Sequence, residues 1–157
     1  MGKLFLILAA LMLAAFAAPQ PGVEDPRAFV AQVYEAYRAH PDSPPPDSSY
    51  AYSDRLRALF ESYDSWQRGH DDLVGALDFD WWVNAQDWSI SRVSFVQYDF
   101  GPDHRVIEAH WTNIDRADST RFFFVRDGGR WYLDEAVNGR GRGRDGWTLS
   151  ALLRERE

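Results

Sequence analysis

The part of the chain that decides the fold is residues 88–137, which read WSISRVSFVQYDFGPDHRVIEAHWTNIDRADSTRFFFVRDGGRWYLDEAV. Stretches rich in Val, Ile, Phe, Tyr and Trp alternate here with turn residues, which is typical of short strands. The pattern predicts four strands, at about 88–100, 105–114, 120–126 and 130–137. The intervening segments are of hairpin length, so we expect an antiparallel sheet.

The first of these strands should be irregular. Its apolar residues change phase along the strand, from Trp88 and Ile90 to Val93 and Phe95, and then to Val96, Tyr98 and Phe100. Because side chains alternate between the two faces of a strand, such a change predicts a bulge or a bend.

Two helices are expected before the sheet. Asp25 and Pro26 suit the first positions of a helix, which should run to about residue 39. Its apolar residues recur at spacings of three and four and form one stripe: Phe29, Val30, Val33, Tyr34 and Tyr37. Ser53 is the expected cap of a second helix, which ends near residue 68. The proline-rich segment 40–50 between them is expected to be a mobile loop.

The C-terminal segment DGWTLSALLRERE carries enough apolar surface to pack against the rest of the domain. Thr148 can cap a short helix there. The preceding GRGRGRDG run spaces arginines with glycines, and we expect residues 139–145 to be a mobile connector. An anion clamp is the alternative for these arginines, but the rest of the domain is acidic.

The N-terminus has the pattern of a cleavable signal peptide. Lys3 precedes an apolar run, residues 4–15, which ends in the small-x-small triplet Ala15-Phe16-Ala17. Cleavage is expected between Ala17 and Ala18, which leaves residues 18–157 as one domain with an ordered core from about residue 25. A membrane anchor is the weaker alternative, because about 14 apolar residues fall short of the ~20 that span a bilayer. The expected location is therefore the bacterial periplasm or the medium.

Composition excludes several classes of function. The 157 residues contain no cysteine and have a formal net charge of -7, so we expect neither disulfides nor nucleic acid as a partner. Lys3 is the sole lysine, which excludes a Schiff base in the mature domain. His40, His70 and His104 fall in predicted loops without ligand spacing, and we expect neither a metal nor another cofactor.

The predicted order of elements, two helices and then an antiparallel meander, resembles the cone-shaped fold of the nuclear transport factor 2-like superfamily. The segments DFDWWVNAQDW (residues 78–88), YSDRL (52–56) and DGWTLSALL (145–153) resemble a bacterial family known as domain of unknown function 3828. Trp81-Trp82 departs from its pattern, where a smaller or proline-containing pair is expected. The resemblance implies an exported α+β domain, with helices packed on a curved four-stranded sheet and a short C-terminal helix. It implies no activity.

Polar residues concentrate just before the sheet: Asp78, Asp80, Asn84, Gln86 and Asp87. We expect them to tie this long connection to neighbouring elements, so that Asp87→Ala and Asn84→Ala destabilise the fold. A polar pocket mouth is the alternative interpretation. A calcium loop is excluded because the central glycine and the distal glutamate are missing.

The resemblance also implies candidate residues for a pocket inside the cone. Enzymes of the superfamily, such as ketosteroid isomerase, place an acid and a tyrosine or second carboxyl there. The residues of this chain that could line such a pocket are Tyr34, Asp87, Trp88, His110, Trp111, Tyr132 and Asp134. For the tyrosines and tryptophans the alternative is core packing with a hydrogen bond at the polar tip. Glu108 and His110 leave the same strand face and could bind a metal or move a proton; the alternative is a solvated face, shared with Thr112.

Two functions remain open at this point. The first is a non-catalytic periplasmic domain that binds a small molecule or an envelope protein at the open end of the cone. The second is an isomerase, dehydratase or hydrolase with an acid/base pair inside the cone. A deep pocket with Asp or His beside Tyr would favour the enzyme, and an interior filled by apolar side chains would favour the binding domain.

Overall fold

The computed structural model describes residues 21–43, 47–70, 73–139 and 146–156. The expected signal peptide, part of the loop 40–50 and most of the connector 139–145 lie outside the described residues. The elements are α1 (Pro26–Ala39), the 3-10 turn η1 (Ser49–Ala51), α2 (Asp54–Arg68), β1 (Ile90–Asp99), β2 (His104–Asn113), β3 (Arg116–Asp127), β4 (Arg130–Asn138), β5 (Trp147–Thr148) and α3 (Leu149–Leu152).

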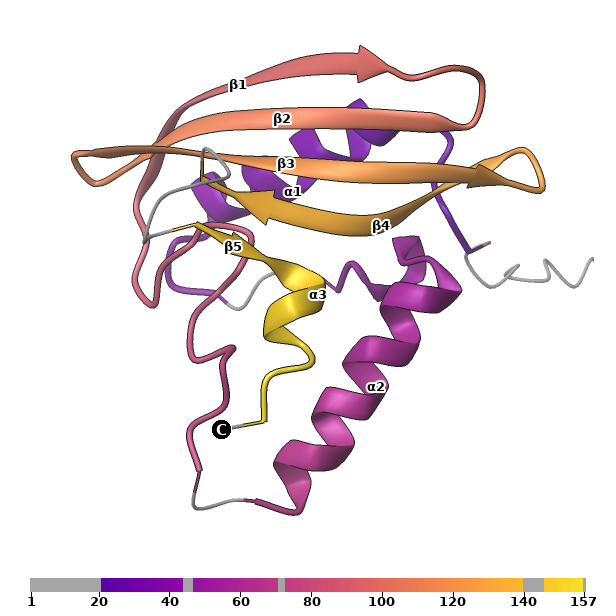
Figure 1. The fold of residues 1–157 in the computed structure, drawn as a ribbon. Helices are drawn as coiled ribbons and strands as arrows, with labels where there is room; N and C mark the ends of the chain where they lie inside the picture. The colour runs from indigo at the N-terminus through magenta and orange to yellow at the C-terminus, as the bar shows by residue number, and fades with distance from the viewer. Residues whose placement is uncertain (1–20, 44–46, 71–72, 140–145, 157) are drawn as a thin grey trace, which may run out of the picture.

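The protein is an α+β fold around an antiparallel meander with the strand order β1-β2-β3-β4-β5 (Figure 1). The described sheet has five strands, so the prediction of four was wrong. The fifth is the two-residue strand β5, in which Trp147 and Thr148 pair with Asn138 and Val137 of β4. A segment this short has no periodicity of its own, and its pairing depends on the tertiary position of α3.

The first two helices begin where the sequence predicted. The carboxylate of Asp25 accepts hydrogen bonds from the backbone N–H groups of Arg27 and Ala28, at 2.8 and 3.2 Å. The hydroxyl of Ser53 accepts one from the N–H of Leu56, at 3.0 Å. These side chains satisfy amides that have no partner within the helix.

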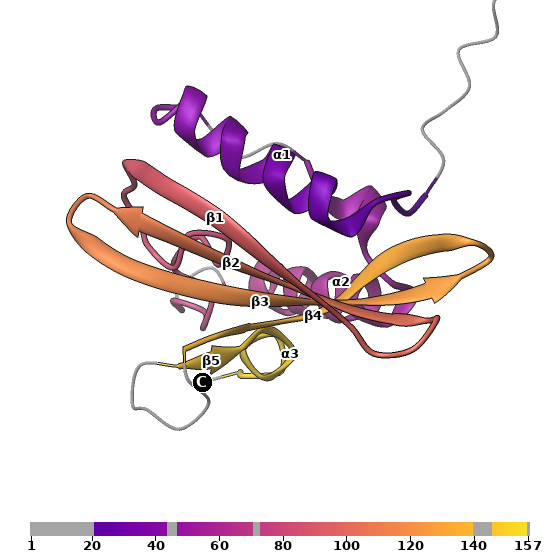
Figure 2. The same cartoon turned by 90° about the horizontal axis from the view of Figure 1, so that it is seen from above.

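Two bulges shape the sheet. The β1–β2 register shifts between Ser91 and Ser94, where Arg92 has a φ of 51°, and this confirms the predicted irregularity of β1. A second shift places Asp134 as an extra residue in β4, between Leu133 and Glu135. Bulges increase the local twist, and the sheet is strongly twisted in Figure 2.

The turn between β2 and β3 is tighter than predicted. We expected residues 115–119 to connect the strands, but only Ile114 and Asp115 separate Asn113 from Arg116. A two-residue hairpin of this kind requires positive φ, and Ile114 adopts 57°. β3 therefore starts at Arg116, four residues earlier than expected.

Helix α3 returns the C-terminal segment to the domain, as predicted. Leu149 and Leu153 are fully buried. Thr148 occupies the N-cap position, but its side chain makes no capping hydrogen bond. The carboxylate of Glu135 on β4 supplies the acceptor, 3.0 Å from the N–H of Ser150.

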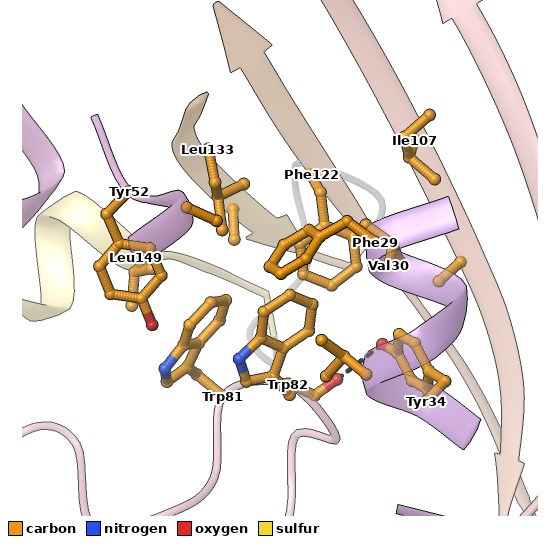
Figure 3. Packing of buried hydrophobic residues seen from close by; sticks show 14 of the residues in the cluster. Phe29, Val30, Tyr34, Tyr52, Trp81, Trp82, Ile107, Phe122, Leu133 and Leu149 are labelled. Carbon is orange, nitrogen blue, oxygen red and sulfur yellow. Dashed lines mark hydrogen bonds between the residues drawn. The ribbon is translucent and has the colours of Figure 1, made fainter. Parts of the chain in front are cut away.

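Helix α1 covers one face of the sheet (Figure 2). Aromatic side chains fill the space between them (Figure 3). The indoles of Trp81 and Trp82 stack with ring centroids 4.7 Å apart, and Trp82 stacks on Phe122 at 4.6 Å. Tyr34 packs against Trp111 at 5.1 Å. The unusual Trp81-Trp82 pair therefore closes the interior of the fold.

Among the described helices, none is both long enough and apolar enough to cross a membrane.

Candidate functional site

The described surface has a groove of about 610 Å³ on the sheet face opposite α1. Phe122 packs on Tyr34 of α1, so its neighbour Phe123 must point to the other face. Val106 and Glu135 are the cross-strand partners of Phe123 and share that face. We call this hollow the open-face groove; its apolar lining residues are Phe100, Val106, Phe123, Phe124, Val125 and Val137.

One end of the open-face groove is charged. Asp134, the bulged residue of β4, accepts hydrogen bonds from the Ser53 hydroxyl at 2.6 Å and from Arg55 Nε at 3.0 Å. The Arg55 guanidinium also reaches Glu135, at 3.5 Å. Partial burial alone would raise the pKa of Asp134, but the hydrogen bonds from Arg55 and Ser53 outweigh it and lower the pKa. The charged side chains of Asp134, Arg55 and Glu135 are therefore paired with one another.

His104 differs from its charged neighbours in the groove. It is the first residue of β2 and is exposed to solvent. In the part of the chain that the structure describes, its imidazole makes no hydrogen bond or ion pair, although it lies near enough to act on the charge of Asp134. A ligand in the groove would therefore find one ring nitrogen able to donate or accept a hydrogen bond.

A second hollow, of about 390 Å³, lies between residues 41–43, which follow α1, and residues 86–88, which precede β1. Its lining is Pro41, Asp42, Ser43, Gln86, Asp87 and Trp88. The Asp87 side chain makes no hydrogen bond to a described residue, whereas its backbone carbonyl accepts one from Asn113 at 3.1 Å. Within the described ranges, no three His, Asp or Glu side chains are grouped as a metal site would require.

Tyr34 and Trp111 belong to the packed interior. The Tyr34 hydroxyl donates to the backbone carbonyl of Trp82 at 2.7 Å, and burial raises the pKa of this phenol well above its ordinary value. Trp111 is 2% exposed. Neither side chain borders either of the two hollows.

The interior also holds an acid beside a tyrosine. The Tyr37 hydroxyl donates to Asp80 at 2.6 Å, and the other carboxylate oxygen of Asp80 accepts from the N–H of Trp82 at 2.9 Å. Burial raises the pKa of Asp80, and the hydrogen bonds it accepts oppose that rise. This pair orients the turn that carries the two tryptophans, and it borders neither hollow.

The remaining candidates are dispersed. His110 lies on the open sheet face, 3.7 Å from Glu108, as the solvated-face interpretation predicted. Tyr132 lies beside Pro21, to whose carbonyl its hydroxyl is 3.5 Å away. Of the seven candidates, Asp87 and Trp88 share the smaller hollow, and Asp134 lies at the open-face groove.

Sequence reasoning did not single out the apolar lining of the open-face groove. A signal was present in the run FFFV, residues 122–125. A strand that faces solvent on one side alternates apolar and polar residues, whereas a continuous apolar run indicates that both faces are covered or occupied. In β3 one face meets α1, and the other lines the groove.

No family model, curated protein or solved structure matches the chain.

Proposed function

We propose that this protein is a non-catalytic binding domain that holds a small, largely apolar molecule in the open-face groove. The proposal rests on a difference between the two faces of the sheet. The space between α1 and the sheet is filled by stacked aromatic side chains (Figure 3). The opposite face of the sheet has an apolar hollow. Binding is therefore assigned to the outer face of the sheet, and not to the inside of a cone.

The dimensions and chemistry of the groove suit a small molecule. Its volume of about 610 Å³ falls within the range of ordinary ligand pockets. Six apolar residues line it, and His104 is the polar group left to orient a ligand. A ligand of this class has an apolar body and one hydrogen-bonding group, which would lie at the His104 end.

The acid/base groups of the protein support binding more than catalysis. The oxygens of Asp134 are engaged by Ser53 and Arg55, and Asp80 is engaged by Tyr37 and a backbone amide. A general base needs a lone pair directed at the substrate. The enzyme alternative rests on His104 near Asp134, but no hydrogen bond between these two described residues orients the imidazole.

We further propose that the protein is exported and belongs to the family of domain of unknown function 3828, with the cone-like curvature of the nuclear transport factor 2-like superfamily. Residues 1–17 support export, and the segment 78–88 supports the family. The α+β order of two helices before a meander is compatible with this proposal. The partner would then be a small molecule of the periplasm.

The neutral fluorescent probe N-phenyl-1-naphthylamine tests the groove. We expect saturable binding to one site and weaker binding by Phe100→Ser, because Phe100 is 63% exposed and lines the groove. Ile114→Ser is the matched control, since Ile114 is 70% exposed and lies outside the groove lining. Equal probe binding by Phe100→Ser and by a second groove variant, Phe123→Ser, would exclude the groove as the site.

A further inference from the structure

The outer edge of the sheet is a long strand without a partner. β1 has ten residues and pairs with β2 on one side only. In the part of the chain that the structure describes, no backbone group from another segment pairs with its other side. Figure 1 shows β1 as the upper border of the sheet, with no described element beyond it. Exposed edges of this kind are templates for a further strand.

The centre of this edge lacks the features that normally prevent pairing. Residues 93–98 read VSFVQY, without charge, proline or glycine. Val96 and Tyr98 are 42% and 44% exposed on the open sheet face. Natural edge strands are usually protected by charged residues, proline or bulges, and here the one bulge lies at the beginning of the strand, at residues 91–94.

The backbone groups that remain unpaired can be assigned. The N–H of Phe100 donates to the carbonyl of His104 at 2.9 Å, so Phe100 directs its backbone toward β2. Directly opposed residues of an antiparallel pair alternate between bonded and non-bonded positions. The backbone groups of Phe95, Gln97 and Asp99 therefore point away from the sheet.

We infer that β1 is the site at which a second copy of this chain pairs, edge to edge and antiparallel, to make a continuous sheet across a two-fold axis. An axis at Val96 places Phe95 opposite Gln97 of the second copy, and both residues have free backbone groups. Val96 then meets its own counterpart, which is a favourable β-branched pair.

The charges favour a second copy over an unrelated strand. The uncharged centre is flanked by Arg92 on one side and Asp99 on the other, and both are exposed. A two-fold axis at Val96 places Arg92 of each copy opposite Phe100 of the other, one residue along from Asp99, whose carboxylate also pairs with Arg105 of its own chain at 2.6 Å. Interfaces of this symmetry must be self-complementary. This edge is self-complementary in its backbone hydrogen bonding, and the antiparallel arrangement brings its positively charged end beside the negatively charged end of the other copy.

Sedimentation velocity over micromolar to submillimolar concentrations, on the soluble protein recovered after expression of the whole chain, tests the proposal. We expect a reversible dimer in the parent. Val96→Lys should raise its dissociation constant about tenfold or more, because like charges would face each other at the axis. Val74→Lys is the matched control, since Val74 is 76% exposed and lies far from β1 in sequence.

A second variant and a second measurement separate this interface from others. Gln97→Pro removes a backbone N–H that points away from the sheet and should also weaken the dimer. In the parent, amide exchange of Phe95 and Gln97 should slow as concentration rises. A parent that stays monomeric over the whole range would overturn the proposal. So would a dimer that both Val96→Lys and Gln97→Pro leave intact, or one whose Phe95 and Gln97 amides exchange at a constant rate. If Val96→Lys fails to fold, Gln97→Pro and the exchange measurement decide.

Discussion

The indole N–H of Trp147 donates a hydrogen bond to the side-chain oxygen of Asn84 at 2.8 Å, and so joins the connection before the sheet to its last strand. The amide nitrogen of Asn84 donates in turn to Asp118 on β3, at 2.9 Å. Asn84 also has a φ of 50°, a conformation that asparagine tolerates better than most residues. One side chain thus links three separate parts of the chain.

Asn84→Ala should lower the free energy of unfolding by about 1–3 kcal/mol, the usual cost of leaving buried partners unsatisfied. The partners affected are the Trp147 indole and the Asp118 carboxylate. Urea or thermal unfolding of the variant measures the loss. A melt identical to that of the parent would contradict the structural role of this residue.

Asp87→Ala is expected to behave differently, although the sequence predicted that both residues stabilise the fold. The Asp87 carboxylate is exposed and makes no hydrogen bond to a described residue, and the contact with Asn113 uses its backbone carbonyl. The change in unfolding free energy should therefore stay within about 0.5 kcal/mol. The same melts serve as the measurement, with Asn84→Ala as the comparison. A loss as large as that of Asn84→Ala would show that the carboxylate has a structural partner after all.

The sequence predicted the helices best, because their signals are local. Asp25 and Ser53 lie at the caps, and the apolar stripe of α1 is determined by spacing alone. The bulge in β1 was predictable for the same reason, since the phase of its apolar residues changes within the strand.

Features that depend on distant contacts could not be predicted. The sequence of β4 contains no pattern that indicates an extra residue at Asp134. The pairing of β5 with β4 depends on the position of α3 beside β4. The same difference between local and long-range features applies to the candidate site. Tyr34 and Trp111 are buried in the core, as the core-packing interpretation predicted, whereas the groove is lined by apolar residues with no distinctive chemistry.

Removal of the C-terminal segment should abolish cooperative folding. Leu149 and Leu153 are fully buried, and burial of two leucines contributes about 3–6 kcal/mol. A chain that ends at Arg144 should therefore lose its cooperative melt and its solubility. Leu149→Ala tests the same contact with less disruption and should cost about 2–5 kcal/mol. If the truncated chain melts like the parent, the segment is not part of the folding unit.

Cleavage of the expected signal peptide can be tested independently of the fold. The mature protein should begin at or near Ala18, because the small-x-small triplet before it is the expected recognition site for cleavage. Mass spectrometry of the intact protein from the periplasmic fraction measures the N-terminus. Recovery of the chain with Met1 in the membrane fraction would contradict cleavage and favour an anchor.

The ion pair at the groove predicts how stability depends on pH. The folded protein lowers the pKa of Asp134 below its ordinary value of 3.8, because the hydrogen bonds from Arg55 and Ser53 outweigh the effect of partial burial. The charged form of Asp134 therefore stabilises the fold above that pH. This contribution is lost as the pH falls through the folded-state pKa.

Asp134→Asn should consequently be less stable than the parent at neutral pH, and the difference in unfolding free energy should shrink as the pH falls below 3.8. Asp80, whose pKa burial raises, has the opposite pH dependence, but it is present in both proteins and cancels in the difference. Urea unfolding of both proteins at a series of pH values measures the effect. A difference that stays constant down to strongly acidic pH would mean that the Asp134 charge does not stabilise the fold through Arg55 and Ser53.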